Sequence, residues 1–170
     1  MKRTNSPIDP SDQALAPAPA LTPEERDRLS AALTLDRQLC FALHAATHAF
    51  QRAYKPLLDR VNLTYPQYLV MLLLWERGPM GVKALGEALY LDSGTLSPLL
   101  KRLEAAGHVE RRRDLADERQ VTISLTPSGR ALRDRAVDIF GTIAARTGCD
   151  AGEAETLRDR LHQLRAAMDT

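Results

Sequence analysis

Two short helical segments joined by a tight turn constrain this fold more than any other feature of the sequence. Apolar residues recur at helical spacing in residues 82–89, the turn Tyr90–Gly94 follows, and a second helix runs to Gly107. The expected inward positions are Val82, Leu85, Leu89, Leu96, Leu99, Leu100 and Leu103. Two short helices around a glycine-containing turn form the helix-turn-helix arrangement, in which the second helix enters the major groove of DNA.

A two-stranded hairpin, which we name the wing, is expected directly after the second helix. Residues 119–126 alternate apolar and polar side chains, the pattern of a strand with one buried face. Residues 108–114 can pair with this strand. The tip between them carries Asp114, Asp117, Glu118 and Arg119.

Helices are predicted on both sides of this unit, so the expected fold class is mainly α with one small β-hairpin. The predicted helices cover residues 22–33, 35–58, 64–77, 127–146 and 150–168. Four of them begin at residues that can cap a helix, namely Thr22, Thr64, Thr126 and Asp150. Pro56 should bend or end the second helix, and Pro98 should loosen the first turn of the helix that ends at Gly107.

The placement of charge, rather than its sum, indicates DNA binding. The chain of 170 residues has 23 Lys and Arg against 22 Asp and Glu, yet residues 101–113 hold five basic residues and only Glu104 and Glu110 as acids. The residues expected to contact DNA are Ser93, Thr95 and Ser97 at the start of the second helix, and Lys101, Arg102 and Arg113 beyond it. The alternative is that the hydroxyls only cap the helix and the basic side chains are solvated.

A single winged module makes too few contacts for useful specificity, so we expect a homodimer on a pseudo-palindromic DNA operator. The apolar stripes of residues 35–57 and 157–168 would supply its interface, unless they pack only on their own core. The expected organisation is a disordered tail at 1–21, N-terminal dimerisation helices at 22–60, a winged helix-turn-helix domain at 61–126 and C-terminal dimerisation helices at 127–170.

Several classes of protein are disfavoured. The apolar stretch 69–75 is too short to span a bilayer, and residues 1–20 lack the apolar core of a signal peptide, so we expect a cytoplasmic protein without a membrane partner. The four His and two Cys show no metal-ligand spacing, and no cofactor is expected. A thiol enzyme using Cys40 with His44 would need an orienting group and an oxyanion site, and neither is visible.

Three stretches resemble a known family. They are YLDSGTLSPLLKRLEAAG (90–107), the wing with Asp117, Arg119, Leu125 and Thr126, and residues 39–76. Together they resemble the MarR family of winged-helix regulators, over roughly residues 35–146. The first and third resemble its organic hydroperoxide resistance regulator branch, OhrR. The resemblance implies a MarR-like fold whose terminal helices form a dimerisation domain, and a transcriptional repressor of the oxidative stress response.

The resemblance also implies roles for individual residues. Cys40 matches the peroxide-reactive cysteine of OhrR, and Tyr54 and Tyr65 match its tyrosine partners. Arg119 resembles the finger that enters the minor groove, with Asp117 holding its guanidinium. Cys40 and Tyr54 lie 14 residues apart, about 21 Å along a straight helix, so Tyr54 would reach a thiol only from a second copy or around a bend.

Two residues keep open alternatives. His44 stands where members of this branch often have another tyrosine, and it is either a thiol-supporting donor or a polar core residue. Cys149 resembles the resolving cysteine that bonds across subunits in two-cysteine OhrR proteins. If Cys149 is instead a bystander, oxidised Cys40 would form a mixed disulfide with a small thiol.

The expected function is a repressor that senses organic hydroperoxides through oxidation of Cys40, which releases the operator and derepresses a peroxide-detoxifying gene. The alternative is a MarR-type repressor that a small aromatic ligand releases.

Overall fold

The structure is a computed structural model that describes residues 20–113 and 121–169. The predicted tail, apart from residues 20 and 21, lies outside the described residues, and so do the wing-tip residues Asp114, Asp117, Glu118 and Arg119. Contacts divide the chain into two compact units, one up to Ala46 and one from Thr47, and each is described by itself.

The first unit contains helix α1 (Pro23–Ala32), a 3-10 turn (Leu35–Arg37) and the beginning of α2 (Leu39–Leu58). The predicted cap of α1 is confirmed, because Thr22 Oγ1 accepts from Glu25 N at 3.2 Å and Glu25 Oε2 accepts from Thr22 N at 2.9 Å. The prediction of one continuous helix from residue 35 is wrong. Gln38 is extended, with φ −83° and ψ 116°, and breaks the helical path so that α2 begins at Leu39.

The second unit contains the rest of α2 and every later element. These elements are a 3-10 turn (Asp59–Val61), α3 (Tyr65–Arg77), β1 (Met80–Gly81), α4 (Val82–Leu89), α5 (Ser93–Ala105), β2 (Val109–Arg113), β3 (Val121–Leu125), α6 (Pro127–Thr147) and α7 (Ala151–Met168). Helix α2 continues to Leu58, two residues beyond Pro56, before it tightens into the 3-10 turn.

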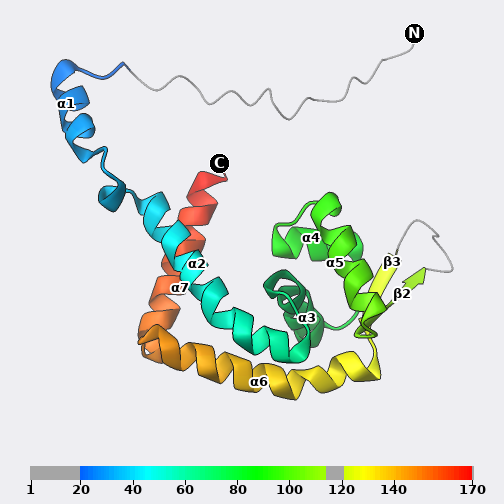
Figure 1. Cartoon of the computed structure of the whole chain (residues 1–170). Coiled ribbons are helices and arrows are strands. Elements are labelled where there is room, and N and C mark those ends of the chain that lie inside the picture. The colour runs from blue at the N-terminus through cyan, green and yellow to red at the C-terminus, as the bar shows by residue number, and fades with distance from the viewer. Residues whose placement is uncertain (1–19, 114–120, 170) are drawn as a thin grey trace, which may run out of the picture. The chain divides into compact units, whose positions relative to one another are not determined.

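The predicted wing is part of a three-stranded antiparallel sheet in the order β1-β3-β2. Figure 1 shows two of its strands, β2 and β3. The central strand β3 pairs Ile123 with Met80 on one side and with Arg111 on the other. Strand β1 was not predicted, because two residues are too few to show a period-2 pattern.

The core of the second unit lies among α3, α4, α5, α6 and the sheet. Leu85 on α4 and Leu96, Leu100 and Leu103 on α5 are at most 1% exposed, which confirms these inward positions of the helix-turn-helix. The other three predicted inward residues, Val82, Leu89 and Leu99, are half-buried. The side chains buried with the four leucines include Leu58, Tyr68, Met71, Leu74, Val109 and Ile123. Burial of these apolar faces fixes α5 on the sheet.

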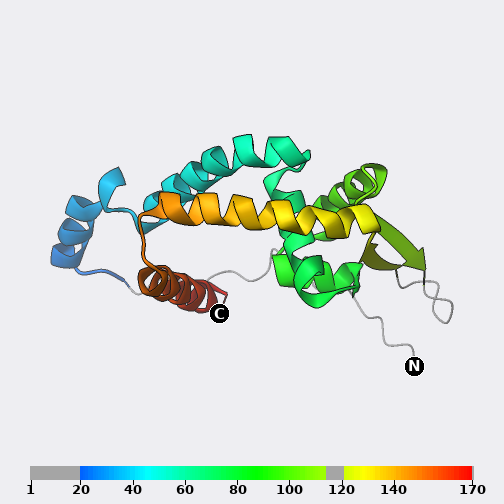
Figure 2. The ribbon, with the colours of Figure 1, turned by 90° about the horizontal axis from the view of Figure 1, so that it is seen from below.

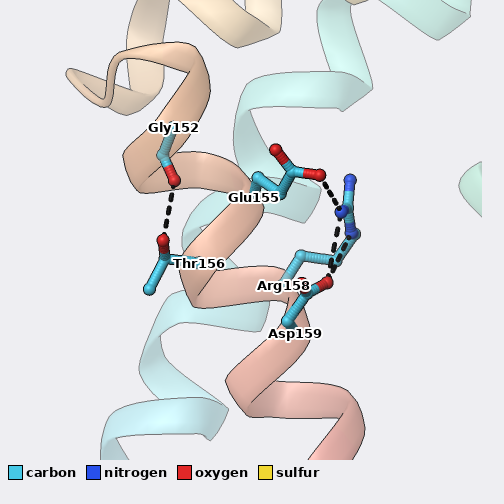
Figure 3. A network of polar contacts seen from close by, with 5 residues as sticks. All are labelled: Gly152, Glu155, Thr156, Arg158 and Asp159. Carbon is cyan, nitrogen blue, oxygen red and sulfur yellow. Dashed lines mark hydrogen bonds and ion pairs between the residues drawn. The ribbon is translucent and has the colours of Figure 1, made fainter.

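The last two helices follow the sheet. Helix α6 starts at β3 and leads away from it as one long rod (Figure 2). Helix α7 begins at the predicted cap, where Glu153 N donates to Asp150 Oδ1 at 2.9 Å. It has no buried residue. Its own side chains form polar contacts with one another, and Arg158 forms ion pairs with Glu155 and Asp159 (Figure 3). None of the helices in the described ranges is long and apolar enough to cross a membrane.

Candidate nucleic-acid interface and thiol site

The turn between α4 and α5 positions the N-terminus of α5. Tyr90 closes α4 in the left-handed region, with φ 55°, and Leu91 N donates to the Gly86 carbonyl oxygen at 2.9 Å. Asp92 then caps α5: Oδ1 accepts from Thr95 N at 2.9 Å, and Oδ2 accepts from Thr95 Oγ1 at 2.7 Å. These two hydrogen bonds from Thr95 lower the pKa of Asp92. The sequence reasoning missed this cap, although Asp92 precedes the helix in the way that caps do.

Ser93, Thr95 and Ser97 lie on the first turns of α5. Ser93 and Thr95 are exposed and Ser97 is half-buried. Pro98 lies inside the helix and has no N–H to donate to the Gly94 carbonyl, but the helix continues through it to Ala105.

The basic residues near α5 fall into two groups. Arg111 Nε lies 3.1 Å from Glu104 Oε2, and Arg112 forms an ion pair with Glu110 at 2.9 Å, so the local acids are already paired. Lys101 and Arg102 are exposed and form no ion pair with the described residues. The backbone of Arg113 ends β2, and its side chain, like Asp117 and Arg119, lies outside the described part of the chain. The unpaired cations described here are therefore on the helix rather than on the strand.

Cys40 lies in the first unit and is the second residue of α2. Its side chain is exposed, and so is that of His44 one turn later. The break at Gln38 thus places the thiol in the first turn of a helix, where the prediction had placed it more than a turn inside.

Three tyrosines cluster in the second unit. The ring centroid of Tyr54 lies 5.0 Å from that of Tyr65 and 5.7 Å from that of Tyr68. Burial, assisted by the two neighbouring phenols, raises the pKa of Tyr54 to about 12, and burial also raises the pKa of Tyr65. Both phenols therefore keep their protons near neutral pH and can donate hydrogen bonds. Tyr68, which is 2% exposed, was not singled out in the sequence because its place in α3 reads as core.

Cys149 lies between α6 and α7, directly after Gly148 at φ 70°. It is half-buried, and its Sγ donates a weak hydrogen bond to the Thr147 carbonyl oxygen at 3.8 Å. Over the ranges that the structure describes, no group of three His, Cys, Asp or Glu residues is arranged to hold a metal ion.

A helix-turn-helix flanked by a small antiparallel sheet, with exposed hydroxyls and exposed cations on its second helix, defines a winged-helix DNA-binding transcriptional regulator. Residues 52–136 match the family described as transcriptional regulator SarA/Rot. The chain belongs to the MarR/SarA-type winged-helix regulators.

Two relatives cover most of the chain. It is 54% identical over 132 residues to the HTH-type transcriptional regulator TtmR of Methylorubrum extorquens, a match that covers 78% of this chain and 68% of TtmR. It is 49% identical over 132 residues to the organic hydroperoxide resistance transcriptional regulator of Bacillus subtilis, covering 78% of this chain and 90% of that protein. These relatives are transcriptional regulators and not enzymes.

Two solved structures share the fold. Reduced AbfR of Staphylococcus epidermidis, solved bound to DNA, has a TM-score of 0.67 and 33% identity, and the match covers 86% of this chain and 99% of AbfR. BpsR of Bordetella bronchiseptica, whose DNA binding is regulated by 6-hydroxynicotinic acid, has a TM-score of 0.69 and 25% identity, with 81% and 97% covered.

Proposed function

We propose that this chain is a cytoplasmic, homodimeric repressor that binds a pseudo-palindromic operator while Cys40 is reduced and releases it when an organic hydroperoxide oxidises Cys40. Release would derepress a gene for a peroxide-detoxifying protein. The observation that carries this proposal is the exposed Cys40 thiol in the first turn of α2, in a chain 49% identical to the Bacillus hydroperoxide resistance regulator.

The position of Cys40 suits a reactive thiol. The first turn of a helix has N–H groups without intrahelical acceptors and carries a partial positive charge, a setting in which reactive thiolates occur. The Cys40 thiolate attacks one peroxide oxygen, an S–O bond forms and the O–O bond breaks. The alkoxide takes a proton and leaves as an alcohol, and Cys40 becomes a sulfenic acid.

A second thiol completes the reaction. Its thiolate attacks the Cys40 sulfur, an S–S bond forms, and the sulfenic oxygen leaves as water after protonation. We assign this role to Cys149 of a second copy, whose half-buried thiol is the other cysteine of the chain. A small thiol takes the role if Cys149 does not.

Hydrogen-bond donors support the thiol in this scheme. Tyr54 and Tyr65, which stay protonated, are assigned to the thiol site through the second copy, because 14 residues of helix separate Cys40 from Tyr54. His44, four residues after Cys40, is assigned as a donor on the same helix.

Exposed apolar side chains support the dimer. Val137 and Phe140 on α6 are 64% and 65% exposed, and Leu157, Leu161 and Met168 on α7 are at least 40% exposed. Apolar rows of this kind on terminal helices are typical of surfaces that a second copy covers.

In the DNA complex, α5 enters the major groove. Ser93, Thr95 and Ser97 meet base edges, and Lys101, Arg102 and Arg113 meet phosphates. Arg119, steadied by Asp117, reaches the minor groove beside the wing.

A second candidate function keeps the repressor and changes the signal to a small aromatic acid. It is favoured by a cavity of about 210 Å³ whose lining is apolar at Leu57, Val61 and Ile139 and carries two cations, Arg60 and Arg135, against one carboxylate, Asp138, with Thr142 beside it. A planar carboxylate would suit such a lining, and BpsR is regulated by a ligand of this chemistry.

A gel shift on the DNA upstream of the gene tests the proposal. Cumene hydroperoxide should release the wild-type protein and dithiothreitol should restore binding. Cys40→Ser should bind DNA and ignore the peroxide, while Cys149→Ser distinguishes a disulfide between copies from a mixed disulfide. Release of Cys40→Ser by peroxide with an unchanged dose response would exclude the thiol mechanism, and release by an aromatic acid would favour the second candidate.

A further inference from the structure

The first turn of α6 meets the end of α5 mainly through backbone groups. We name this contact, formed by Trp75, Gly107, His108, Thr126 and Gly129, the α6 joint. Thr126 N donates to the His108 carbonyl oxygen at 3.1 Å, and Thr126 Oγ1 donates to the Gly107 carbonyl oxygen at 2.6 Å. The same hydroxyl oxygen accepts from Gly129 N at 3.0 Å and caps α6.

Glycine is required at residue 129 by the closeness of this contact. A Cβ built on Gly129 would overlap the carbonyl oxygen of His108, a backbone atom that no side-chain rotation can move away. The other side of Gly129 is also held, because its carbonyl oxygen accepts from Trp75 Nε1 at 2.9 Å. The first turn of α6 is therefore clamped between the end of α3 and the start of β2.

The same peptide groups end the recognition helix. Gly107 turns the chain at φ 73°, Gly107 N donates to the Glu104 carbonyl oxygen at 2.9 Å, and His108 N donates to the Leu103 carbonyl oxygen at 3.0 Å. The last turn of α5 and the first turn of α6 thus share the residues Gly107 and His108. A shift of α6 cannot occur without moving α5, unless these hydrogen bonds break.

We propose that the α6 joint couples α6 to the recognition helix as one rigid body, and that Gly129 and Trp75 are positioning residues for DNA reading. A movement at the dimer interface is then transmitted through α6 to the recognition helix, α5, in the major groove of DNA. The part of this inference that concerns release by peroxide rests on the proposed function, whereas the part that concerns the affinity of reduced protein for DNA does not.

The first test compares glycines on one helix. Gly129→Ala should weaken the binding of reduced protein to the upstream DNA by about tenfold or more, measured by fluorescence anisotropy. The matched control Gly141→Ala adds the same methyl group where nothing of the same chain lies within 4 Å. Because Gly141 lies four residues after Val137, on the face proposed for the dimer, sedimentation velocity first checks that this variant is still a dimer, and it should then bind as wild type. Equal affinity of the two variants would overturn the proposal. If Gly129→Ala does not fold, Trp75→Phe, which keeps a ring and loses only the N–H donor and part of the bulk, replaces it.

The second test measures coupling. For Trp75→Phe the ratio of Kd after cumene hydroperoxide to Kd before it should fall by about threefold or more, with the thermal midpoint of a folded protein retained. A wild-type ratio that persists in Trp75→Phe would overturn the coupling role. If cumene hydroperoxide does not change the Kd of the wild type, the proposed peroxide function fails. The Gly129→Ala comparison alone then decides whether the α6 joint positions α5.

The single tryptophan supplies a third measurement. If the joint moves as one body, the emission maximum of Trp75 should be the same in reduced, oxidised and DNA-bound wild-type protein, and should shift in Gly129→Ala. A shift in the wild type on oxidation would show that the Trp75 to Gly129 hydrogen bond opens, which contradicts a rigid joint.

Discussion

Arg111 on strand β2 holds Glu104 on helix α5, with Nε and Oε2 3.1 Å apart, and its Nη2 also donates to the Ser97 carbonyl oxygen at 3.4 Å. One arginine of the basic run 101–113 thus links the sheet to the recognition helix, α5. Its side chain is 26% exposed, so it has little surface to offer a phosphate.

Salt dependence separates the two roles. Lys101→Gln should lower the slope of log K against log salt by about 0.9, the loss of one phosphate contact. Arg111→Gln should weaken binding through a misplaced α5 and leave the slope unchanged. If Arg111→Gln lowers the slope as much as Lys101→Gln does in a salt titration of the gel shift, Arg111 contacts a DNA phosphate.

The cap of α5 should matter for both stability and binding. Asp92→Ala leaves the amide of Thr95 without its acceptor, so we expect a lower thermal midpoint and a severalfold weaker affinity for DNA. Asp92→Asn, which keeps an oxygen acceptor, should lie between this variant and wild type. Thermal melts and anisotropy measure the two effects, and an Asp92→Ala protein as stable as wild type would contradict the role of the cap.

His108 makes the stability depend on pH. Burial lowers its pKa below the ordinary 6.5, and no hydrogen-bond partner for Nδ1 is present among the residues described. The unfolded chain therefore takes up a proton just below pH 6.5 and the folded chain only at lower pH, so stability should fall as the pH drops through this window. Urea melts between pH 7.5 and 5.5 should show a smaller fall for His108→Gln than for wild type. The surface control His162→Gln should retain the wild-type fall.

The exposed apolar side chains on α6 and α7 predict which substitution should disrupt the dimer. Phe140→Glu places a charge at a side chain that is 65% exposed in one chain and should raise the dimer Kd by about 30-fold or more if it is a central contact. Leu72→Glu, at an α3 position that is 39% exposed, should leave the dimer intact. Sedimentation velocity with a parallel gel shift checks both, and an unchanged dimer in Phe140→Glu would move the interface elsewhere.

Local chemistry made much of this fold predictable. The caps Thr22, Thr126 and Asp150 placed helix starts correctly, because a capping side chain is a signal within four residues. The start of α2 was misplaced because no such signal marks it. Thr34 makes no side-chain capping bond, and the apolar stripe continues through Gln38 although the helix does not. The period of the apolar residues indicates which face of a helix is buried, but it does not indicate where the backbone leaves the helical path.

The site was less predictable than the fold. The pairing of Arg111 with Glu104 and the contact of Tyr68 with Tyr54 depend on how strands and helices pack, and no spacing in the chain encodes either. The roles of Cys40, Tyr54 and Tyr65 came from resemblance to a family, since a single cysteine on a helix has no signature of its own. The residues Asp117 and Arg119 remain predictions.

The hydroxyl of Thr95 has one hydrogen, and the ionised carboxylate of Asp92 already holds it at an O–O distance of 2.7 Å. In hydrogen bonds to a base edge this hydroxyl can therefore offer only its lone pairs. In the major groove the amino groups of adenine and cytosine supply hydrogens, whereas the N7 and O6 atoms of guanine are themselves acceptors. The Asp92 cap at the start of α5 therefore also favours bases with an amino group in the major groove as hydrogen-bond partners of the Thr95 hydroxyl.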